Sequence, residues 1–132
     1  MPAEMSTDLH LLVWSVALCV LQMLIAVITA QGQVGLPTLA ANREPPLALT
    51  GLAGRAQRAH RNMLENLGLF AALVLVAQAT GRANDVTALG AAIFFWARVA
   101  YAIVYLVGLP WVRTGVWGVS MAGIVMVFLQ AL

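Results

Sequence analysis

The sequence predicts an all-α integral membrane protein, a bundle of four transmembrane helices. Of its 132 residues, 62% are hydrophobic and 9% are charged, whereas soluble globular domains have roughly 45–50% and about 25%. A short chain has much surface for its volume, so seven basic and five acidic side chains could not cover it in water. These observations disfavour a soluble domain, a disordered chain and a nucleic-acid-binding module.

Four hydrophobic stretches supply the predicted spans, and we expect them to form a single domain over residues 1–132. Each stretch is close to the roughly 20 residues that cross the hydrocarbon core of a bilayer. The first is not expected to be a cleaved signal peptide, because Glu4 and Asp8 precede it and no Lys or Arg does. The predicted spans are residues 9–30, 63–80, 86–108 and 111–132.

The three connections differ in length and composition. Residues 81–85 form a polar turn, so the second and third spans should be an antiparallel hairpin. Pro110 suits the first turn of a new helix. The first connection, residues 31–54, is longer and has no helix signals. Its apolar side chains indicate that it packs on the rest of the protein; they are Leu36, Leu39, Leu47, Leu49 and Leu52.

The distribution of arginine predicts the orientation in the membrane. Positive residues favour the cytoplasmic side. Arg82 lies in the connection on one side, and all other arginines near span ends lie on the other side. Both termini are therefore expected on the non-cytoplasmic side. The cytoplasmic set is Arg43, Arg55, Arg58, Arg61 and Arg113.

Polar residues before the second span share one helix face. Arg58, Arg61, Asn62 and Glu65 are spaced by three, four and seven residues from the first of them, which places them on one side of a helix. The face offers several hydrogen-bond donors and one carboxylate. Arg61 can instead turn outward to the lipid headgroups.

A second polar set lies in the third span, where Arg98, Tyr101 and Tyr105 are again spaced by three and seven residues. An arginine near the middle of a span costs about 2.5–3.5 kcal/mol on insertion scales unless it has a partner. In an antiparallel hairpin, Tyr101 should be level with Glu65. Arg98 would then lie about one turn deeper, within reach of the Glu65 carboxylate.

The same pairing places Tyr105 level with Arg61 and Asn62. Two interpretations of these polar faces stay open. The contacts can simply hold helices together in lipid, or the arginines can bind an anion. Arginine exceeds carboxylate in this region, and its guanidinium makes two parallel hydrogen bonds with carboxylates. The excess of positive charge therefore favours an anionic ligand.

Several other residues are expected to have structural roles. Cys19 should be a small side chain facing lipid or another helix. His60 points away from the Arg58 face and should pack at an interface. Gly118 and Ala122 form a small-residue step typical of close helix packing. No pattern of Cys and His predicts a metal site.

Three segments resemble the MAPEG superfamily, membrane-associated proteins in eicosanoid and glutathione metabolism. Residues 55–66 (RAQRAHRNMLEN) are similar to its second-helix signature, residues 96–105 (WARVAYAIVY) to its third-helix pattern, and residues 110–114 (PWVRT) to its third turn. The resemblance suggests a bacterial-type member similar to microsomal glutathione S-transferase. The resemblance implies a homotrimer that binds glutathione between subunits, in a bacterial inner membrane.

The resemblance also implies roles for individual residues. Arg58, Asn62 and Glu65 match the positions that hold glutathione in the family. Tyr101 and Tyr105 match tyrosines that line this site.

Two further arginines complete the implied site. Arg98 matches the arginine that precedes the third-helix tyrosines. Arg113 lies one residue from the position of an arginine thought to stabilise the thiolate, and it is the expected catalytic residue. His60 and Asn66 replace a glutamine and a tyrosine found in leukotriene C synthase, which weakens the case for an eicosanoid substrate.

The implied function is activation of the glutathione thiolate for conjugation to, or reduction of, a lipophilic electrophile or hydroperoxide delivered by membrane lipids. A catalytically silent binding or scaffold protein with the same fold is the main alternative. A small multidrug-type transporter is disfavoured because residues 9–30 contain no acidic side chain.

Overall fold

A computed structural model describes residues 4–132, and every regular element in this range is a helix. The elements are α1 (Thr7–Val34), α2 (Leu36–Ala40), α3 (Gly51–Ala79), α4 (Asp85–Val107) and α5 (Pro110–Ala131). All except α2 are long and apolar enough to cross a membrane. The prediction of a four-helix membrane bundle is therefore confirmed. The distribution of arginine predicts on which side of the membrane the N-terminal amine lies. This amine is outside the described residues.

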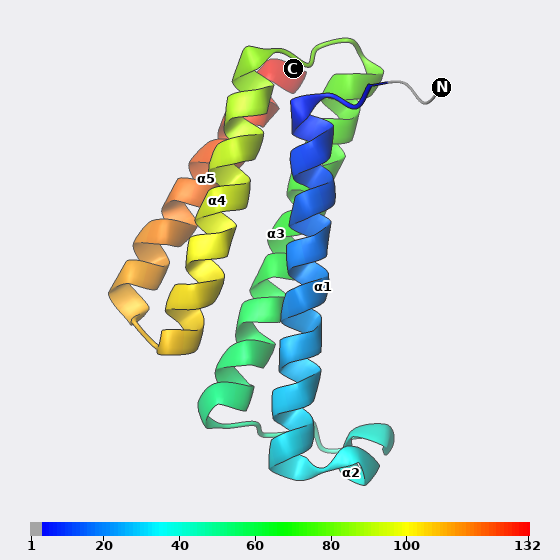
Figure 1. The fold of residues 1–132 in the computed structure, drawn as a ribbon, viewed down its shortest axis with the longest axis vertical. Coiled ribbons are helices and arrows are strands. Elements are labelled where there is room, and N and C mark those ends of the chain that lie inside the picture. Colours follow the sequence, from blue (N-terminus) through cyan, green and yellow to red (C-terminus); the bar gives the residue numbers. More distant parts are fainter. Residues whose placement is uncertain (1–3) are drawn as a thin grey trace.

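The four long helices run antiparallel to their neighbours in the chain, as two pairs (Figure 1). α1 packs mainly along α3, and α4 packs mainly along α5. The α3–α4 turn, the start of α1 and the C-terminus lie together at one end of the bundle. We call the other end, which holds α2 and the α4–α5 turn, the arginine end, because Arg43, Arg55, Arg58 and Arg113 lie in its connections and adjoining helix turns.

Two helix boundaries differ from the prediction. α3 begins at Gly51, within the connection predicted to end at residue 54 and well before the apolar stretch predicted from residue 63, because hydropathy marks only the apolar part of a helix. The polar turns of α3 that precede residue 63 are rich in Ala and Arg, which also favour helix. The first connection was expected to lack helix, but α1 continues to Val34, and the short helix α2 follows with Pro37 in its first turn.

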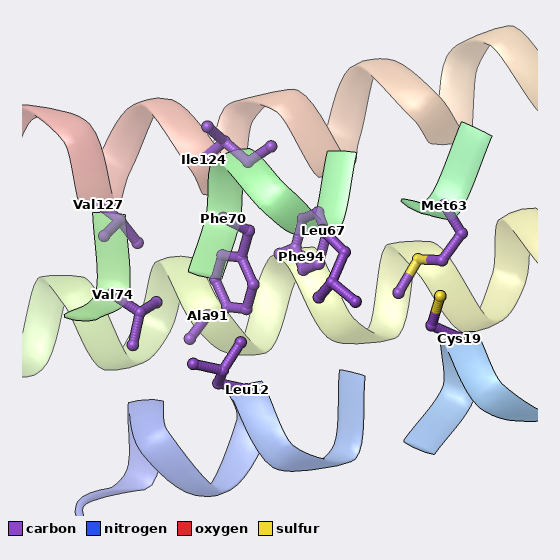
Figure 2. Packing of buried hydrophobic residues seen from close by; sticks show 10 residues of the cluster. All are labelled: Leu12, Cys19, Met63, Leu67, Phe70, Val74, Ala91, Phe94, Ile124 and Val127. Carbon is purple, nitrogen blue, oxygen red and sulfur yellow. The ribbon is translucent and has the colours of Figure 1, made fainter. Parts of the chain in front are cut away.

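The apolar core is built around one face of α3. Its side chains Met63, Leu67, Phe70 and Val74 point toward the other long helices (Figure 2). The ring of Phe70 stacks on that of Phe94 with centroids 4.1 Å apart. Such spacing of apolar residues by three and four positions is what buries a helix face.

Cys19 lies in this core, buried beside Met63 (Figure 2). Its thiol is not in a disulfide. The prediction that Cys19 faces lipid or another helix is therefore confirmed, since its side chain packs between helices. Because it is shielded within the packed helices, Cys19 contributes apolar contact.

Two glycines allow α4 and α5 to approach closely. A Cβ atom on Gly123 would lie 2.6 Å from the carbonyl oxygen of Gly90, and one on Gly90 would lie 2.8 Å from that of Gly123. Any larger residue would push the helices apart. The small-residue step at Gly118 and Ala122 was expected to pack closely, but both residues are exposed in this subunit.

A buried carboxylate joins three helices at the end opposite the arginine end. The Asp8 side chain, 3% exposed, accepts hydrogen bonds from Ser6 Oγ at 2.6 Å, Gln78 Nε2 at 2.8 Å and Thr87 Oγ1 at 3.1 Å. We call these four residues the Asp8 cluster. Thr87 also forms a capping box with Asn84 at the start of α4. The cluster therefore connects α1, the end of α3 and the first turn of α4.

Candidate functional site

The first polar part of the site lies near the start of α3. Arg58 and Glu65 are exposed, and Asn62 is half-buried. A Cβ atom on Gly54 would lie 2.7 Å from the carbonyl oxygen of Leu49 and 3.1 Å from Arg58 Nη1. Glycine at this position therefore lets the first connection and the Arg58 guanidinium approach the helix.

Tyr105 is the point at which three helices meet. Arg58 Nε donates a hydrogen bond of 3.2 Å to the Tyr105 hydroxyl. The Arg113 guanidinium carbon lies 4.6 Å from the centroid of the Tyr105 ring, within the range of a cation–π contact. α3, α4 and α5 thus bring together Arg58, Tyr105 and Arg113, three of the residues to which the family resemblance assigned roles in the site.

The second part of the site lies deeper in the bundle. The Tyr101 and Tyr105 rings meet edge to face with centroids 5.5 Å apart. The guanidinium carbon of Arg98 lies 4.1 Å from the centroid of the Tyr101 ring, and Arg98 Nη2 donates a hydrogen bond of 2.7 Å to Asn62 Oδ1. Asn66 Nδ2 donates to the Asn62 carbonyl oxygen at 2.7 Å and to Oδ1 at 3.2 Å.

The predicted partners of Tyr105 and Arg98 were wrong by about one helix turn. Tyr105 contacts Arg58 rather than Arg61 or Asn62. Arg98 bonds to Asn62 rather than to Glu65, whose exposed side chain makes no hydrogen bond to the residues that the structure describes. Long arginine side chains span a helix turn, so residue levels along the helix axes do not settle which partner they reach.

Arg98 is the most enclosed charge of the site. It is 1% exposed, and its Nε and Nη1 atoms have no hydrogen-bond partner among the described residues. Its remaining nitrogen, Nη2, bonds to the neutral Asn62 side chain, so no carboxylate among the described residues hydrogen-bonds the Arg98 guanidinium. The site therefore has an uncompensated positive charge, with donors that a carboxylate would satisfy.

Two neighbouring arginines have other positions. Arg55 Nε donates a hydrogen bond of 3.1 Å to the carbonyl oxygen of Leu106 in the last turn of α4, where a cation is favourable. Sequence reasoning counted Arg55 only as a cytoplasmic charge, because a bond to a backbone oxygen leaves no side-chain pattern. Arg61 is exposed on the outer side of α3.

A family model for the MAPEG family matches residues 11–132. The chain belongs to the MAPEG family. Neither the curated proteins nor the solved structures gave a significant match. MAPEG proteins include glutathione-dependent enzymes and members without catalytic activity.

The family places this chain among four-helix membrane bundles, in agreement with the four long helices. MAPEG members commonly use glutathione as substrate or cofactor. Within residues 4–132, no group of three His, Cys, Asp or Glu side chains lies close enough to hold a metal ion.

Proposed function

We propose that this MAPEG protein binds glutathione at the Arg58–Tyr105–Arg113 site and activates its thiolate for attack on a lipophilic electrophile or hydroperoxide. The observation that carries the proposal is the uncompensated positive charge. Arg58 bonds to the Tyr105 hydroxyl, and the Arg113 guanidinium lies over the Tyr105 ring. Deeper in the bundle, Arg98 has two donor nitrogens without a partner among the described residues.

The charges of glutathione match those of the site. The tripeptide has two carboxylates and one ammonium group. Arg58 has donors for a carboxylate, and Asn62 is held next to it by Arg98 and Asn66. The exposed Glu65 carboxylate is the acidic group on this face and suits the ammonium. All three side chains would act on the thiol and thiolate forms alike.

Thiolate stabilisation is assigned to Arg113. A free thiol has a pKa of about 8.5, so only a few per cent is ionised at neutral pH. A cation about 4 Å from the sulfur contributes about 4 kcal/mol at an effective dielectric constant near 20. Because 1.4 kcal/mol corresponds to about one pKa unit, one arginine suffices to make the thiolate the main form. Arg113 at the start of α5 is half-buried and near Tyr105, which suits this role.

The proposal includes a homotrimer with the arginine end in the cytoplasm and the second substrate arriving from lipid. Most of α5 faces outward in the single subunit, and its buried residues are Ser120, Gly123, Ile124 and Val127. The outward α5 face is therefore available to lipid or to another subunit.

A catalytically silent membrane protein is the second candidate, and burial of the site supports it. Arg98, Tyr101 and Tyr105 are all buried, so their contacts also act as ordinary links between α3 and α4. The small multidrug-type transporter is further disfavoured. Asp8 does lie in the first helix, but three side chains hydrogen-bond its carboxylate.

The test is to titrate the purified protein in detergent with glutathione, measuring binding by calorimetry and ionisation of the thiol by thiolate absorbance. S-methylglutathione, whose sulfur cannot ionise, is the control ligand. The enzyme should bind both ligands, produce thiolate only from glutathione, and release chloride from a chlorodinitrobenzene. Binding without thiolate or turnover would support the silent protein. Absence of binding would exclude both the site and the activity.

A further inference from the structure

One backbone carbonyl group at the end of α4 has no backbone donor. The last carbonyl groups of a helix lack N–H partners within it, and here the N–H groups of Gly108 and Leu109 satisfy those of the preceding turn. No backbone N–H group in residues 4–132 donates to the Leu106 oxygen. In a continuing helix its donor would be residue 110, but Pro110 has no N–H group. The Leu106 oxygen therefore needs a donor from another element.

Arg55 of α3 supplies this donor. Its Nε donates a hydrogen bond of 3.1 Å to the Leu106 oxygen, and the charge strengthens the bond because the carbonyl end of a helix is negative. A Cβ atom on Gly108 would lie 3.7 Å from both the Cδ and the Nε atoms of Arg55. The half-buried Arg55 side chain thus lies along the α4–α5 turn and keeps this turn bonded to α3.

The α4–α5 turn is too short for Arg113 to keep its position if the turn moves. Gly108 and Leu109 alone connect α4 to α5, which begins at Pro110. The backbone N–H of Arg113 donates to the Leu109 carbonyl oxygen at 3.0 Å. Arg113 is therefore attached to the turn by the chain and by this hydrogen bond, and a displacement of the turn would displace Arg113 as well.

Arg55 and Arg58 contact the end of α4 in different ways. Arg58 bonds to a side chain, the Tyr105 hydroxyl, at 3.2 Å, whereas Arg55 bonds to a backbone oxygen in the next residue. The Arg113 guanidinium carbon lies 4.6 Å from the centroid of the Tyr105 ring. The distance between Arg113 and a ligand held by α3 at Tyr105 therefore depends on how the α4–α5 turn is held against α3.

We propose that Arg55 is a positioning residue, which holds Arg113 at the distance from the glutathione sulfur at which it stabilises the thiolate. This role rests on the proposed function. At an effective dielectric constant near 20, moving a cation from about 4 to about 6 Å removes about a third of its attraction to the sulfur. Such a displacement raises the pKa of the bound thiol by about 1, because the neutral form is then favoured.

Two variants of equal side-chain length separate the hydrogen bond of Arg55 from its charge. Arg55→Gln retains an N–H donor at the position of Nε and removes the charge, whereas Arg55→Met removes both. The measurement is a pH titration of thiolate absorbance for glutathione bound to the purified protein in detergent. Arg55→Met should raise the pKa of the bound thiol by about 1, and Arg55→Gln should stay close to the wild type. Binding of S-methylglutathione should be unchanged in both variants.

The matched control is Arg43→Met. Arg43 Nε also donates to a backbone carbonyl oxygen, that of Leu39, at 2.9 Å. The control variant therefore removes the same kind of bond and one positive charge from the arginine end, but not from the α4–α5 turn, and should leave the thiol pKa unchanged. A second control combines Arg55→Met with Arg113→Ala. Because Arg55 acts through Arg113, its substitution should have no further effect in this background.

The outcomes for the wild type and for the variants are distinct. A wild-type protein that binds no glutathione, or binds it without forming thiolate, would overturn the proposed function and the role of Arg55 with it. When the wild type forms thiolate, an unchanged thiol pKa in Arg55→Met would overturn the positioning role alone. Equal rises in Arg55→Gln and Arg55→Met would do the same, because they would show that Arg55 acts by its charge. A further rise in the Arg113→Ala background would also contradict action through Arg113.

Discussion

Arg98 in α4 donates a hydrogen bond of 2.7 Å to the side-chain oxygen of Asn62 in α3, and this oxygen is its one hydrogen-bond partner among the described residues. Asn62 also accepts from Asn66. Asn62 is therefore satisfied with or without Arg98, whereas Arg98 is incompletely satisfied even with Asn62. The proposed glutathione site would account for this asymmetry, because a carboxylate would satisfy the remaining Arg98 donors.

Replacing Arg98 with Met should leave the empty protein as stable as the wild type or stabilise it by up to about 2 kcal/mol. The substitution removes two buried donors that lack partners, each of which costs about 1–3 kcal/mol. The stabilisation that glutathione gives should disappear. The measurement is the unfolding midpoint in detergent with and without glutathione. A marked loss of stability in the empty variant would show that Arg98 is a structural link.

Arg58→Ala and Arg113→Ala should separate the binding of glutathione from its activation. Arg58→Ala should weaken binding by about 2–5 kcal/mol, because a carboxylate would lose its charged partner. Arg113→Ala should leave S-methylglutathione binding nearly unchanged, while thiolate absorbance near neutral pH and turnover disappear together. If the thiol pKa in the Arg113 variant equals that of the wild-type complex, thiolate stabilisation must come from another group, and Arg98 and Tyr101 are the next candidates.

Asp8→Ala should lower the free energy of unfolding by about 1–3 kcal/mol, since the buried Thr87 hydroxyl and the half-buried Gln78 amide would both lose this charged acceptor. Asp85→Ala is the matched control. It removes an exposed carboxylate from the first turn of α4, where the helix dipole makes it worth about 0.3–1 kcal/mol. Comparable losses in both variants would mean that the Asp8 cluster adds no more than a surface charge does.

Gly123→Ala should destabilise the subunit by about 1–3 kcal/mol, because the new methyl group would overlap the Gly90 carbonyl oxygen. Gly32→Ala should be neutral or slightly stabilising, as nothing lies within 4 Å of its added Cβ atom. Denaturant titration in mixed micelles measures both. An unaltered midpoint for Gly123→Ala would indicate that α4 and α5 can separate freely.

The proposed orientation can be checked by labelling single cysteines in a Cys19→Ala background. Asn42→Cys in the first connection should react only from the cytoplasmic side, and Arg82→Cys in the α3–α4 turn only from the other side. A membrane-impermeant maleimide added to intact cells and to inverted vesicles distinguishes the two. Reaction of Asn42→Cys in intact cells would reverse the topology.

The sequence was sufficient to predict the four long helices, since apolar stretches of this length have few other solutions in a membrane. The resemblance of three segments to one family assigned Arg58, Tyr105 and Arg113 to one site, although helix periodicity matched Tyr105 with Arg61 and Asn62 instead. Periodicity did not settle which side chains touch. Arg98 was matched with Glu65 because they are near in level, although the shorter Asn62 faces α4.

The Asp8 cluster and the Gly90–Gly123 contact could not be predicted because they join residues far apart in the chain. Asp8 was read only as a charge before the first span, and its partner Thr87 lies 79 positions away. Likewise, glycines are common in membrane helices, and nothing local distinguishes Gly123 from Gly118. Such pairings depend on how neighbouring helices are rotated, which a single sequence does not specify.

The two ends of the subunit differ in the length of the side chains that join the helix pairs. Away from the arginine end, short groups touch, namely the Asp8 carboxylate and the Thr87 hydroxyl. At the arginine end, the flexible side chains of Arg55 and Arg58 bridge α3 to α4. A long side chain can follow a partner that moves, whereas a short one loses contact. The bundle thus combines a rigid end with a compliant one, and the separation of its helix pairs can adjust where the arginines lie without disturbing the register set at the other end.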